Sequence, residues 1–172
     1  MVNIQAANNL KNELSSLLVE LSNIQDKIRI KLSTHAENKN LKGNEIVGWL
    51  GEIYGKLLLN GELVDDSKEH DLVTPERWRV SVKTRKGVSP SWRRSSAIPK
   101  IEGDDCPTHL LFVKLNGLYE LEQAWLFNWK DLREEGRFRK KKVRGLHRSF
   151  IFMLKESLDS DNEIYPTNKF GL

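Results

Sequence analysis

Two charged side chains in the middle of the sequence could take part in the hydrolysis of a phosphodiester. Asp71 stands at the start of a short apolar stretch, and Lys83 follows within a stretch of alternating residues. Phosphodiester cleavage needs a water made nucleophilic near neutral pH, and stabilisation of charge on the phosphate and leaving oxygen. A divalent ion held by carboxylates can supply both, and a lysine can orient or deprotonate the water. Asp71 and Lys83 have the side chains that such a site requires.

The residues around Asp71 and Lys83 predict two neighbouring strands. The stretch "HDLVT" (70–74) is short and apolar, and "TPERW" (74–78) supplies turn residues. The stretch "RWRVSVKTR" (77–85) alternates between apolar and polar residues, which predicts a strand with two different faces. One face carries Trp78, Val80 and Val82, and the other carries Arg79, Ser81, Lys83 and Arg85.

A helix predicted over about residues 44–59, with Asn44 as its N-cap, precedes these strands. Three glycines share one stripe of this helix: Gly48, Gly51 and Gly55. Each costs ~1 kcal/mol relative to alanine inside a helix, so the three together indicate a close approach of backbone, sheet or ligand. Glu52 lies beside the stripe and could supply a further carboxylate. The alternative that Glu52 is an ordinary surface residue stays open.

Three of these stretches together resemble the core of the PD-(D/E)XK, or restriction-endonuclease-like, superfamily. They are "GWLGEIYGKLLL" (48–59), "HDLV" (70–73) and "VSVKTRK" (80–86). The likeness is greatest to small bacterial nuclease-like proteins and Holliday-junction resolvases. There, a G-x-x-G-E helix precedes a strand that begins with aspartate and a strand that ends in an acid, any residue and lysine. The resemblance implies a mixed α/β fold of order α-β-β-β-α-β, double-stranded DNA as substrate, and one or two Mg²⁺ ions, or Mn²⁺.

The resemblance also implies roles for individual residues. Carried over by position, Asp71 is the main metal ligand, Glu52 the helix carboxylate that also binds metal, and Lys83 the active-site lysine. The backbone carbonyl of Val82 would be a further metal ligand. With Ser81, at the position of the family's acid, the predicted catalytic residues are four: Glu52, Asp71, Ser81 and Lys83.

Two positions depart from the family pattern. His70 stands where the pattern's name has proline, and Ser81 stands where an acidic residue is usual. A hydroxyl is a poor Mg²⁺ ligand compared with a carboxylate. Restriction enzymes of this superfamily with S-x-K recruit a carboxylate from elsewhere, for which Glu52 and Glu45 are candidates here. If neither reaches the site, the protein would be a degenerate member that does not cut.

A long basic segment follows the strand that carries Lys83. Residues 86–108 predict an irregular insertion, which in a compact domain is usually functional or disordered. Its basic residues could grip DNA phosphates, with the tryptophan packed on a sugar or base. The predicted DNA-binding residues are Arg85, Lys86, Trp92, Arg93 and Arg94. A second basic run at 137–148 is predicted as a connection that is either solvated or in contact with DNA.

The rest of the chain predicts further elements on either side. Residues 109–115 and 119–129 indicate a hairpin around an Asn116-Gly117 turn, followed by a short helix at 129–135. Residues 149–154 form an apolar element of undecided type. A helix over about residues 4–32 has the a/d spacing of a coiled coil at Ala7, Leu10, Leu14, Leu17, Leu21, Ile24 and Ile28. This face either packs on its own domain or forms a homodimer interface.

Composition narrows the classes of function. The net charge of +4 favours nucleic acid as a partner without requiring it. The single cysteine excludes an intramolecular disulfide, in keeping with a reducing cytoplasm. We expect no signal peptide and no membrane span, since no apolar run approaches ~20 residues. A phosphate-binding G-x-x-x-x-G-K-[ST] loop is missing, which disfavours an ATPase.

The sequence therefore predicts an α/β protein with a restriction-endonuclease-like core, in which helices flank a mixed central β-sheet behind a long N-terminal helix. The expected divisions are a helix at 1–34 as a possible dimerisation element, a nuclease domain at 35–160 and a polar tail at 161–172. The leading hypothesis is a cytoplasmic Mg²⁺-dependent DNA endonuclease of a restriction or defence type. The alternatives are a repair or junction-resolving nuclease, a DNA-binding subunit that does not cut, and a coiled-coil scaffold.

Overall fold

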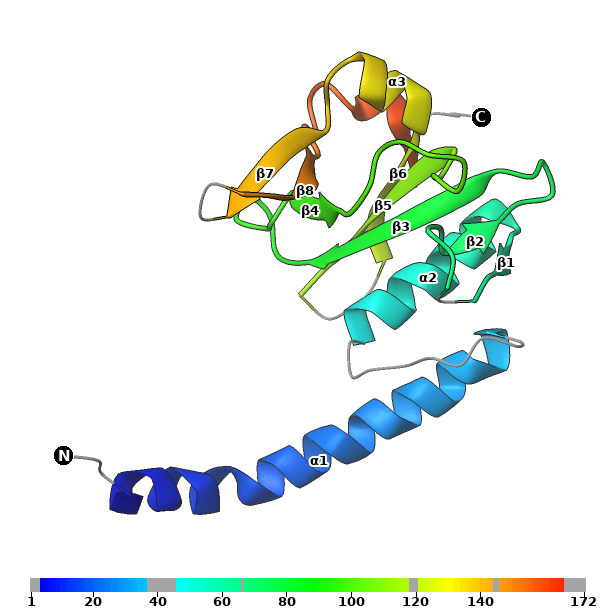
Figure 1. Cartoon of the computed structure of the whole chain (residues 1–172). Coiled ribbons are helices and arrows are strands. Elements are labelled where there is room, and N and C mark those ends of the chain that lie inside the picture. Colours follow the sequence, from blue (N-terminus) through cyan, green and yellow to red (C-terminus); the bar gives the residue numbers. More distant parts are fainter. Residues whose placement is uncertain (1–3, 37–45, 66, 118–120, 144–145, 166–172) are drawn as a thin grey trace.

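The computed structural model describes residues 4–36, 46–65, 67–117, 121–143 and 146–165 (Figure 1). Within these residues the main sheet has six strands in the order β1-β2-β3-β5-β6-β9. Their bounds are Glu62–Leu63 for β1, Leu72–Val73 for β2, Arg79–Lys86 for β3, His109–Leu115 for β5, Leu121–Asn128 for β6 and Glu163–Tyr165 for β9. β3 and β5 are parallel and the other neighbours are antiparallel. The protein is thus α/β with a mixed central sheet, as predicted.

A smaller sheet was not predicted. β4 (Ser95–Ile98), β7 (Arg139–Val143) and β8 (Leu146–Met153) form an antiparallel sheet in the order β4-β8-β7. The interpretation of 86–108 as wholly irregular and of 137–148 as a connection was therefore wrong. β4 is short and β7 is mostly basic, so neither has the alternation by which a strand is recognised in sequence. Their strand conformation comes from pairing with β8, which includes residues 149–153 of the undecided element.

Helix α2 (Ile46–Leu59) covers one face of the main sheet (Figure 1). Two of its glycines let the helix approach the strands closely, as the sequence predicted. A Cβ on Gly51 would lie 1.6 Å from Oγ1 of Thr84, and one on Gly55 would lie 2.9 Å from Leu111. Gly48 has no atom within 4 Å of such a Cβ, so it does not share this role. The predicted N-cap Asn44 lies outside the described residues.

The two faces of the main sheet pack against different elements. The face under α2 carries a cluster that includes Leu72, Val80, Val82, Leu111 and Val113. The opposite face packs against the small sheet and α3 (Trp129–Glu134) through Ile98, Leu110, Phe112, Trp125, Trp129 and Phe152. Ser81 and Lys83 pair in register with Leu110 and Phe112, so they lie on this second face. The predicted alternation along β3 is confirmed by this register.

Helix α1 (Ile4–Ala36) meets the domain only at its C-terminal end among the described side chains. Ile28, Leu32 and Ala36 pack with α2, and the other end of the helix extends away from the sheets (Figure 1). Leu21 and Ile24 of the predicted seam are 50% and 53% exposed. The seam residues Ala7, Leu10, Leu14 and Leu17 have side chains outside the described part of the structure. Packing on the domain therefore accounts for Ile28, but it leaves Leu21 and Ile24 uncovered.

The order of elements around β3 can be compared with the family order α-β-β-β-α-β. α2 is followed by β1, β2 and β3, and β5 then pairs parallel to β3. The crossover between β3 and β5 contains β4 where the family order has a helix. Downstream, β9 follows a short 3₁₀ helix (Ser160–Asn162) and pairs with β6, so residues 163–165 belong to the sheet rather than to a polar tail. No helix among the described residues has the length and apolar character needed to span a bilayer.

Candidate functional site

The position of Asp71 follows from the pairing of β2 with β3. Leu72 pairs with Val80, and the backbone N–H of Asp71 donates to the carbonyl of Val80 at 2.9 Å. Asp71 thus lies at the end of this pairing, and its side chain contacts Ser81 on the face away from α2. Its Oδ2 accepts a 2.6 Å hydrogen bond from the backbone N–H of Val82 and a longer one, 3.4 Å, from Oγ of Ser81.

A hollow of about 150 Å³ opens around this carboxylate, and we refer to it as the Asp71 hollow. Its polar lining consists of Lys68, Glu69, Asp71, Ser81, Lys83 and Lys100. Its walls are Ile98, Pro99, Pro107 and Trp129. The three lysines and two carboxylates give the lining a net charge of +1 (three minus two). The ammonium of Lys83 makes no hydrogen bond or ion pair with another described residue, so it is available to a ligand.

The hollow brings together three of the four predicted catalytic residues: Asp71, Ser81 and Lys83. Glu52 does not line it, because α2 lies on the other face of the sheet. Glu52 is half-buried and has interactions within the domain. Its alternative Glu45 lies outside the described residues.

The backbone of Val82 faces the same edge of β3 as Asp71. Alternate residues of a strand direct their N–H and C=O groups to the same side. The carbonyl of Val80 accepts from the N–H of Asp71, and the N–H of Val82 donates to its carboxylate. The carbonyl of Val82 therefore also points to the side on which Asp71 lies.

Sequence reasoning missed Lys68, Glu69 and Lys100, which line the same hollow. Glu69 was within reach of sequence analysis, since it stands two positions before Asp71 in the loop that leads into β2. Lys100 comes from the segment after β4, which no sequence pattern linked to Asp71. Glu69 is exposed and is the second carboxylate of the hollow.

The oxygen atoms of the hollow suit a hard cation that takes few protein ligands. Mg²⁺ prefers oxygen ligands, usually takes one or two carboxylates and keeps several waters or substrate oxygens. Asp71 and Glu69 offer carboxylates, and Val82 offers a carbonyl on the same side. A fuller protein cage is not available, because the described ranges contain no group of three or more His, Cys, Asp or Glu side chains that could hold a metal ion.

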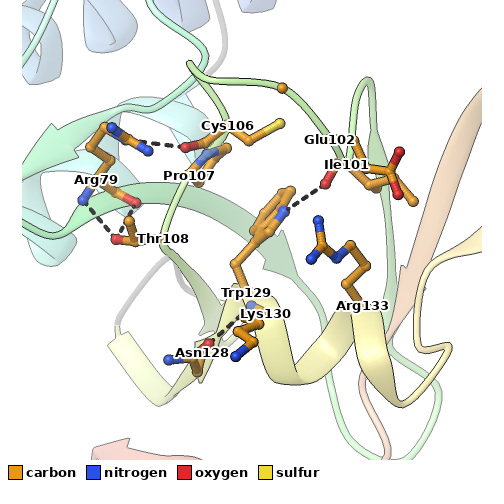
Figure 2. A pocket seen from close by; sticks show the side chains of 11 residues that line it. Arg79, Ile101, Glu102, Cys106, Pro107, Thr108, Asn128, Trp129, Lys130 and Arg133 are labelled. Carbon is orange, nitrogen blue, oxygen red and sulfur yellow. Dashed lines mark hydrogen bonds between the residues drawn. The ribbon is translucent and has the colours of Figure 1, made fainter.

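A second hollow, of about 390 Å³, is drawn in Figure 2 and shares Pro107 and Trp129 with the lining of the Asp71 hollow. We refer to it as the Arg133 hollow. Its charged lining consists of Arg79, Glu102, Lys130 and Arg133. Cys106 lies in its wall, where burial raises the pKa of the thiol and makes a reactive thiolate unfavourable. Nearby, burial and the charge of Arg79 lower the pKa of His70, which lines neither hollow.

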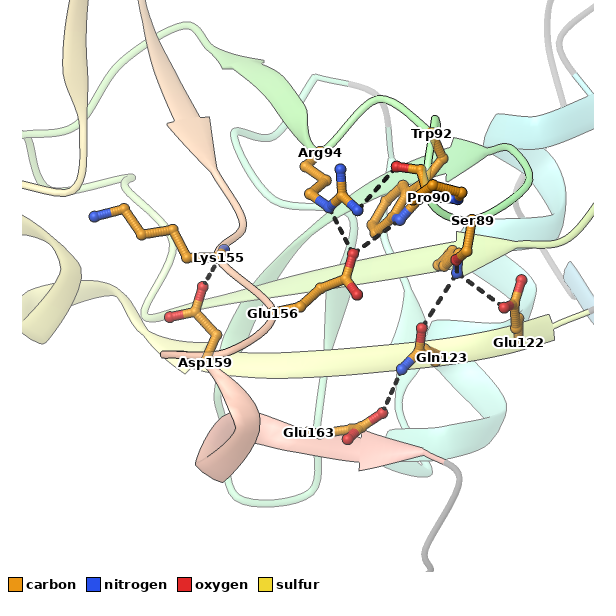
Figure 3. A network of polar contacts seen from close by, with 11 residues as sticks. Ser89, Pro90, Trp92, Arg94, Glu122, Gln123, Lys155, Glu156, Asp159 and Glu163 are labelled. Atoms are coloured by element: carbon orange, nitrogen blue, oxygen red, sulfur yellow. Dashed lines mark hydrogen bonds and ion pairs between the residues drawn. The ribbon is translucent and has the colours of Figure 1, made fainter.

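Trp92 and Arg94, two of the predicted DNA-binding residues, are engaged within the domain. Trp92 is 4% exposed and its indole N–H donates to Glu156 at 2.9 Å (Figure 3). This burial contradicts the predicted contact of Trp92 with a DNA sugar or base. Arg94 forms an ion pair with the same carboxylate at 2.5 Å. Burial disfavours ionised Glu156, but the hydrogen bonds from Arg94 and Trp92 outweigh it and lower the pKa of Glu156.

The other three predicted DNA-binding residues differ in their surroundings. Arg85 is half-buried and donates to the carbonyl of Ser95 at 2.8 Å and to Oγ of Ser96 at 3.2 Å. Lys86 is half-buried and has interactions within the domain. Arg93 is exposed. None of the five predicted residues lines the Asp71 hollow, so these five are not the part of the insertion that contacts it.

Comparisons with known proteins leave the function to be argued from this geometry. No protein-family model matches the chain, and no curated protein matches it. The resemblance to PD-(D/E)XK nucleases therefore rests on residues 48–59, 70–73 and 80–86 alone. Of these stretches, the second and third contribute residues to the Asp71 hollow.

Proposed function

We propose that the protein is a Mg²⁺-dependent DNA endonuclease whose site is the Asp71 hollow. The observation that carries the proposal is the convergence of Asp71 and Lys83 in one hollow, with the carboxylate held by the N–H of Val82. A carboxylate that binds a hard cation and an unpaired ammonium beside it are the groups that phosphodiester hydrolysis requires.

The residues of the hollow would act at different points of the reaction. Asp71 and the carbonyl of Val82 would hold the ion, and Glu69 could share it. When bound, Mg²⁺ would stabilise charge on the phosphate and lower the pKa of a bound water. Lys83 would orient the attacking water and balance the negative charge that develops on the phosphate. Ser81 would help to hold the Asp71 carboxylate, rather than bind the ion. Glu52, the second carboxylate predicted from the family resemblance, does not line the hollow and has no role in this proposal.

The finer assignment to the restriction-endonuclease-like fold is part of the same proposal. It is supported by the order α2-β1-β2-β3 and by the parallel pairing of β5 with β3. The β4 segment would take the place of the family's crossover helix. A long insertion that carries tryptophan and arginine favours a restriction role, since such residues suit the recognition of a DNA sequence. In the structure, however, Trp92 and Arg94 both bind Glu156. The proposal therefore stops at double-stranded DNA cleavage in the cytoplasm, without a choice between defence and repair.

A homodimer through α1 also belongs to the proposal. Leu21 and Ile24 have the a/d spacing of a coiled-coil seam and are about half exposed. A second copy of the helix would cover them. Two copies would supply two hollows, one for each strand of a duplex.

A second candidate is a DNA-binding subunit of the same fold that does not cut. It is favoured by Ser81, which stands where the family has an acid and whose hydroxyl contacts Asp71 at 3.4 Å. In that case Asp71 would be the sole carboxylate of the hollow with a fixed position, and the basic lining would bind DNA without hydrolysis.

The decisive experiment incubates the purified protein with supercoiled plasmid and Mg²⁺. We expect nicked or linear product that disappears with a chelator and falls at least about 100-fold in Asp71→Asn, because a metal ligand supplies several kcal/mol. The asparagine keeps an oxygen that can accept from Val82, so the fold should persist. Asp104→Asn is the matched control, since Asp104 is exposed and lines neither hollow. Cutting that survives in Asp71→Asn overturns the site, and binding without cutting favours the second candidate.

A further inference from the structure

The lining of the Arg133 hollow carries more positive charge than the lining of the Asp71 hollow. Its lining contains three cations, Arg79, Lys130 and Arg133, and one carboxylate, Glu102, which leaves a net charge of +2 (three minus one). The Asp71 hollow has a net charge of +1 by the same count. A concave surface with excess positive charge attracts anions.

The donors of these cations are only partly used within the domain. Nε of Arg79 donates to the carbonyl of Cys106 at 3.1 Å, which orients the guanidinium at the hollow (Figure 2). Lys130 is 3.8 Å from Glu134 in an exposed pair, which is a weak interaction. The guanidinium of Arg133 makes no hydrogen bond or ion pair with another described residue, and it points toward the Trp129 side of the hollow. Several N–H donors therefore remain for a ligand.

The walls between the cations are held in place by hydrogen bonds. The indole N–H of Trp129 donates to the carbonyl of Ile101 at 3.2 Å, and its backbone N–H donates to the carbonyl of Thr108 at 2.9 Å. Oγ1 of Thr108 accepts from the backbone N–H of Arg79 at 2.9 Å. These bonds tie β3, α3 and the segment before β5 together, so the hollow is organised before a ligand arrives.

We infer that the Arg133 hollow binds a phosphate group of the DNA strand, next to the phosphate that is cut in the Asp71 hollow. This inference rests on the proposed function. A phosphate matches the ligand that guanidinium groups bind best, through paired N–H donors. Pro107 and Trp129 line both hollows, so one strand can follow the surface from Asp71 to Arg133. The hollow fixes the position of the strand on the protein and reads no base.

The test measures binding of a short DNA duplex by Arg133→Gln, Lys130→Gln and the double variant, over a range of salt concentrations without divalent ions. Lys155→Gln is the matched control, because Lys155 is an exposed cation that lines neither hollow. We expect the magnitude of the slope of log affinity against log salt to fall by about one for Arg133→Gln, and further for the double variant. Each phosphate contact that is lost reduces the number of counterions released when the DNA binds. Lys155→Gln should keep the slope of the wild type.

The outcomes separate this inference from the proposed function. If the wild type binds DNA and the variants keep its salt slope, the inference is overturned while the endonuclease proposal stands. If the wild type binds no DNA at low salt, the proposed function fails, and titration with inorganic phosphate and thymidine monophosphate decides the inference. Saturable binding of either compound that is lost in Arg133→Gln would assign the hollow to a free phosphate ligand. Binding of neither compound would refute a phosphate site.

Discussion

The backbone N–H of Val82 donates a 2.6 Å hydrogen bond to Oδ2 of Asp71, which ties the entry to β2 to the middle of β3. This bond fixes one carboxylate oxygen, while Oδ1 makes no hydrogen bond to another described residue. The same backbone position directs its carbonyl toward the Asp71 side. The short bond from the main chain sets the direction of the carboxylate, and the longer bond from Oγ of Ser81 adds to it. This geometry suits a metal ligand in a site whose other polar side chains are three lysines, Glu69 and Ser81.

Replacing Lys83 should slow cleavage without abolishing DNA binding. We expect Lys83→Gln to lower the rate at saturating DNA by about 10²–10⁴-fold, the usual contribution of a group that acts on the attacking water. Lys100→Gln is the control, because it removes the same charge from the same hollow. That variant should weaken binding but leave the rate at saturating DNA close to the wild-type value. Equal rates for the two variants would show that Lys83 acts only through its charge.

The second carboxylate can be identified by metal binding without reference to activity. We expect Glu69→Gln to lower the affinity for Mn²⁺ by at least about tenfold. Loss of a residue that only supports a metal ligand lowers affinity by about 10–100-fold, and loss of a ligand itself should cost no less. Glu52→Gln should have little effect, because α2 covers the opposite face of the sheet. Titration of Mn²⁺ by electron paramagnetic resonance measures both. The reverse pattern would restore Glu52 to the site predicted from the sequence.

The close contact between α2 and β3 predicts that replacing two glycines of α2 by alanine changes the stability of the protein in opposite directions. A Cβ on Gly51 would lie 1.6 Å from Oγ1 and 2.7 Å from Cβ of Thr84, so Gly51→Ala should destabilise the protein by about 1–3 kcal/mol. Gly48→Ala is the matched control, since nothing lies within 4 Å of its added Cβ. It should raise the free energy of unfolding by up to ~1 kcal/mol through helix propensity. Urea unfolding measures both changes, and a neutral Gly51→Ala would contradict the contact.

His109 should make the protein less stable in mild acid. Burial lowers the pKa of His109, and Asp131 offsets this only in part. Because the folded-state pKa lies below the unfolded value of 6.5, the unfolded chain binds more protons as the pH falls. The stabilisation is therefore present above pH 6.5 and is lost as the pH falls toward the folded-state pKa. His70 contributes in the same direction.

The test compares the free energy of unfolding at neutral and mildly acidic pH in wild type and variants. His109→Gln should reduce the loss of stability on acidification, even if it is less stable overall through loss of the Trp78 stack at 4.2 Å. His35→Gln, which removes an exposed imidazole from α1, should keep the wild-type dependence. An unchanged dependence in His109→Gln would exclude this histidine as its source.

The exposed part of the α1 seam predicts the oligomeric state. We expect the wild type to sediment as a dimer and the double variant Leu21→Glu, Ile24→Glu to sediment as a monomer with its domain still folded, because buried charges would oppose helix pairing. Asn23→Glu adds a charge to an exposed position outside the a/d spacing and should remain a dimer. A monomeric wild type at micromolar concentrations would remove the dimer from the proposal.

Local patterns in the sequence were sufficient to predict those features that depend on one element and its neighbours along the chain. The alternation of β3, the hairpin of β5 and β6 and the close approach at Gly51 and Gly55 all follow from side-chain periodicity or from the cost of glycine in a helix. These features depend on neighbours along the chain. The placement of Asp71 and Lys83 in one hollow was also within reach, because β2 and β3 are consecutive and a short turn joins them.

Tertiary structure decided which distant residues meet. β7 is a strand only because it pairs with β8, since a basic run has no strand periodicity of its own. Trp92 is buried because it packs against Phe112 and Trp125 of the core, and Glu156, far along the chain, accepts its indole hydrogen bond. Lys100 reaches the Asp71 hollow, and Glu52 does not, because the side of the sheet on which a segment packs is set by the whole core. The sequence alone thus determined β2, β3, the β5–β6 hairpin and the two charged groups Asp71 and Lys83, while long-range packing determined the small sheet and the rest of the site.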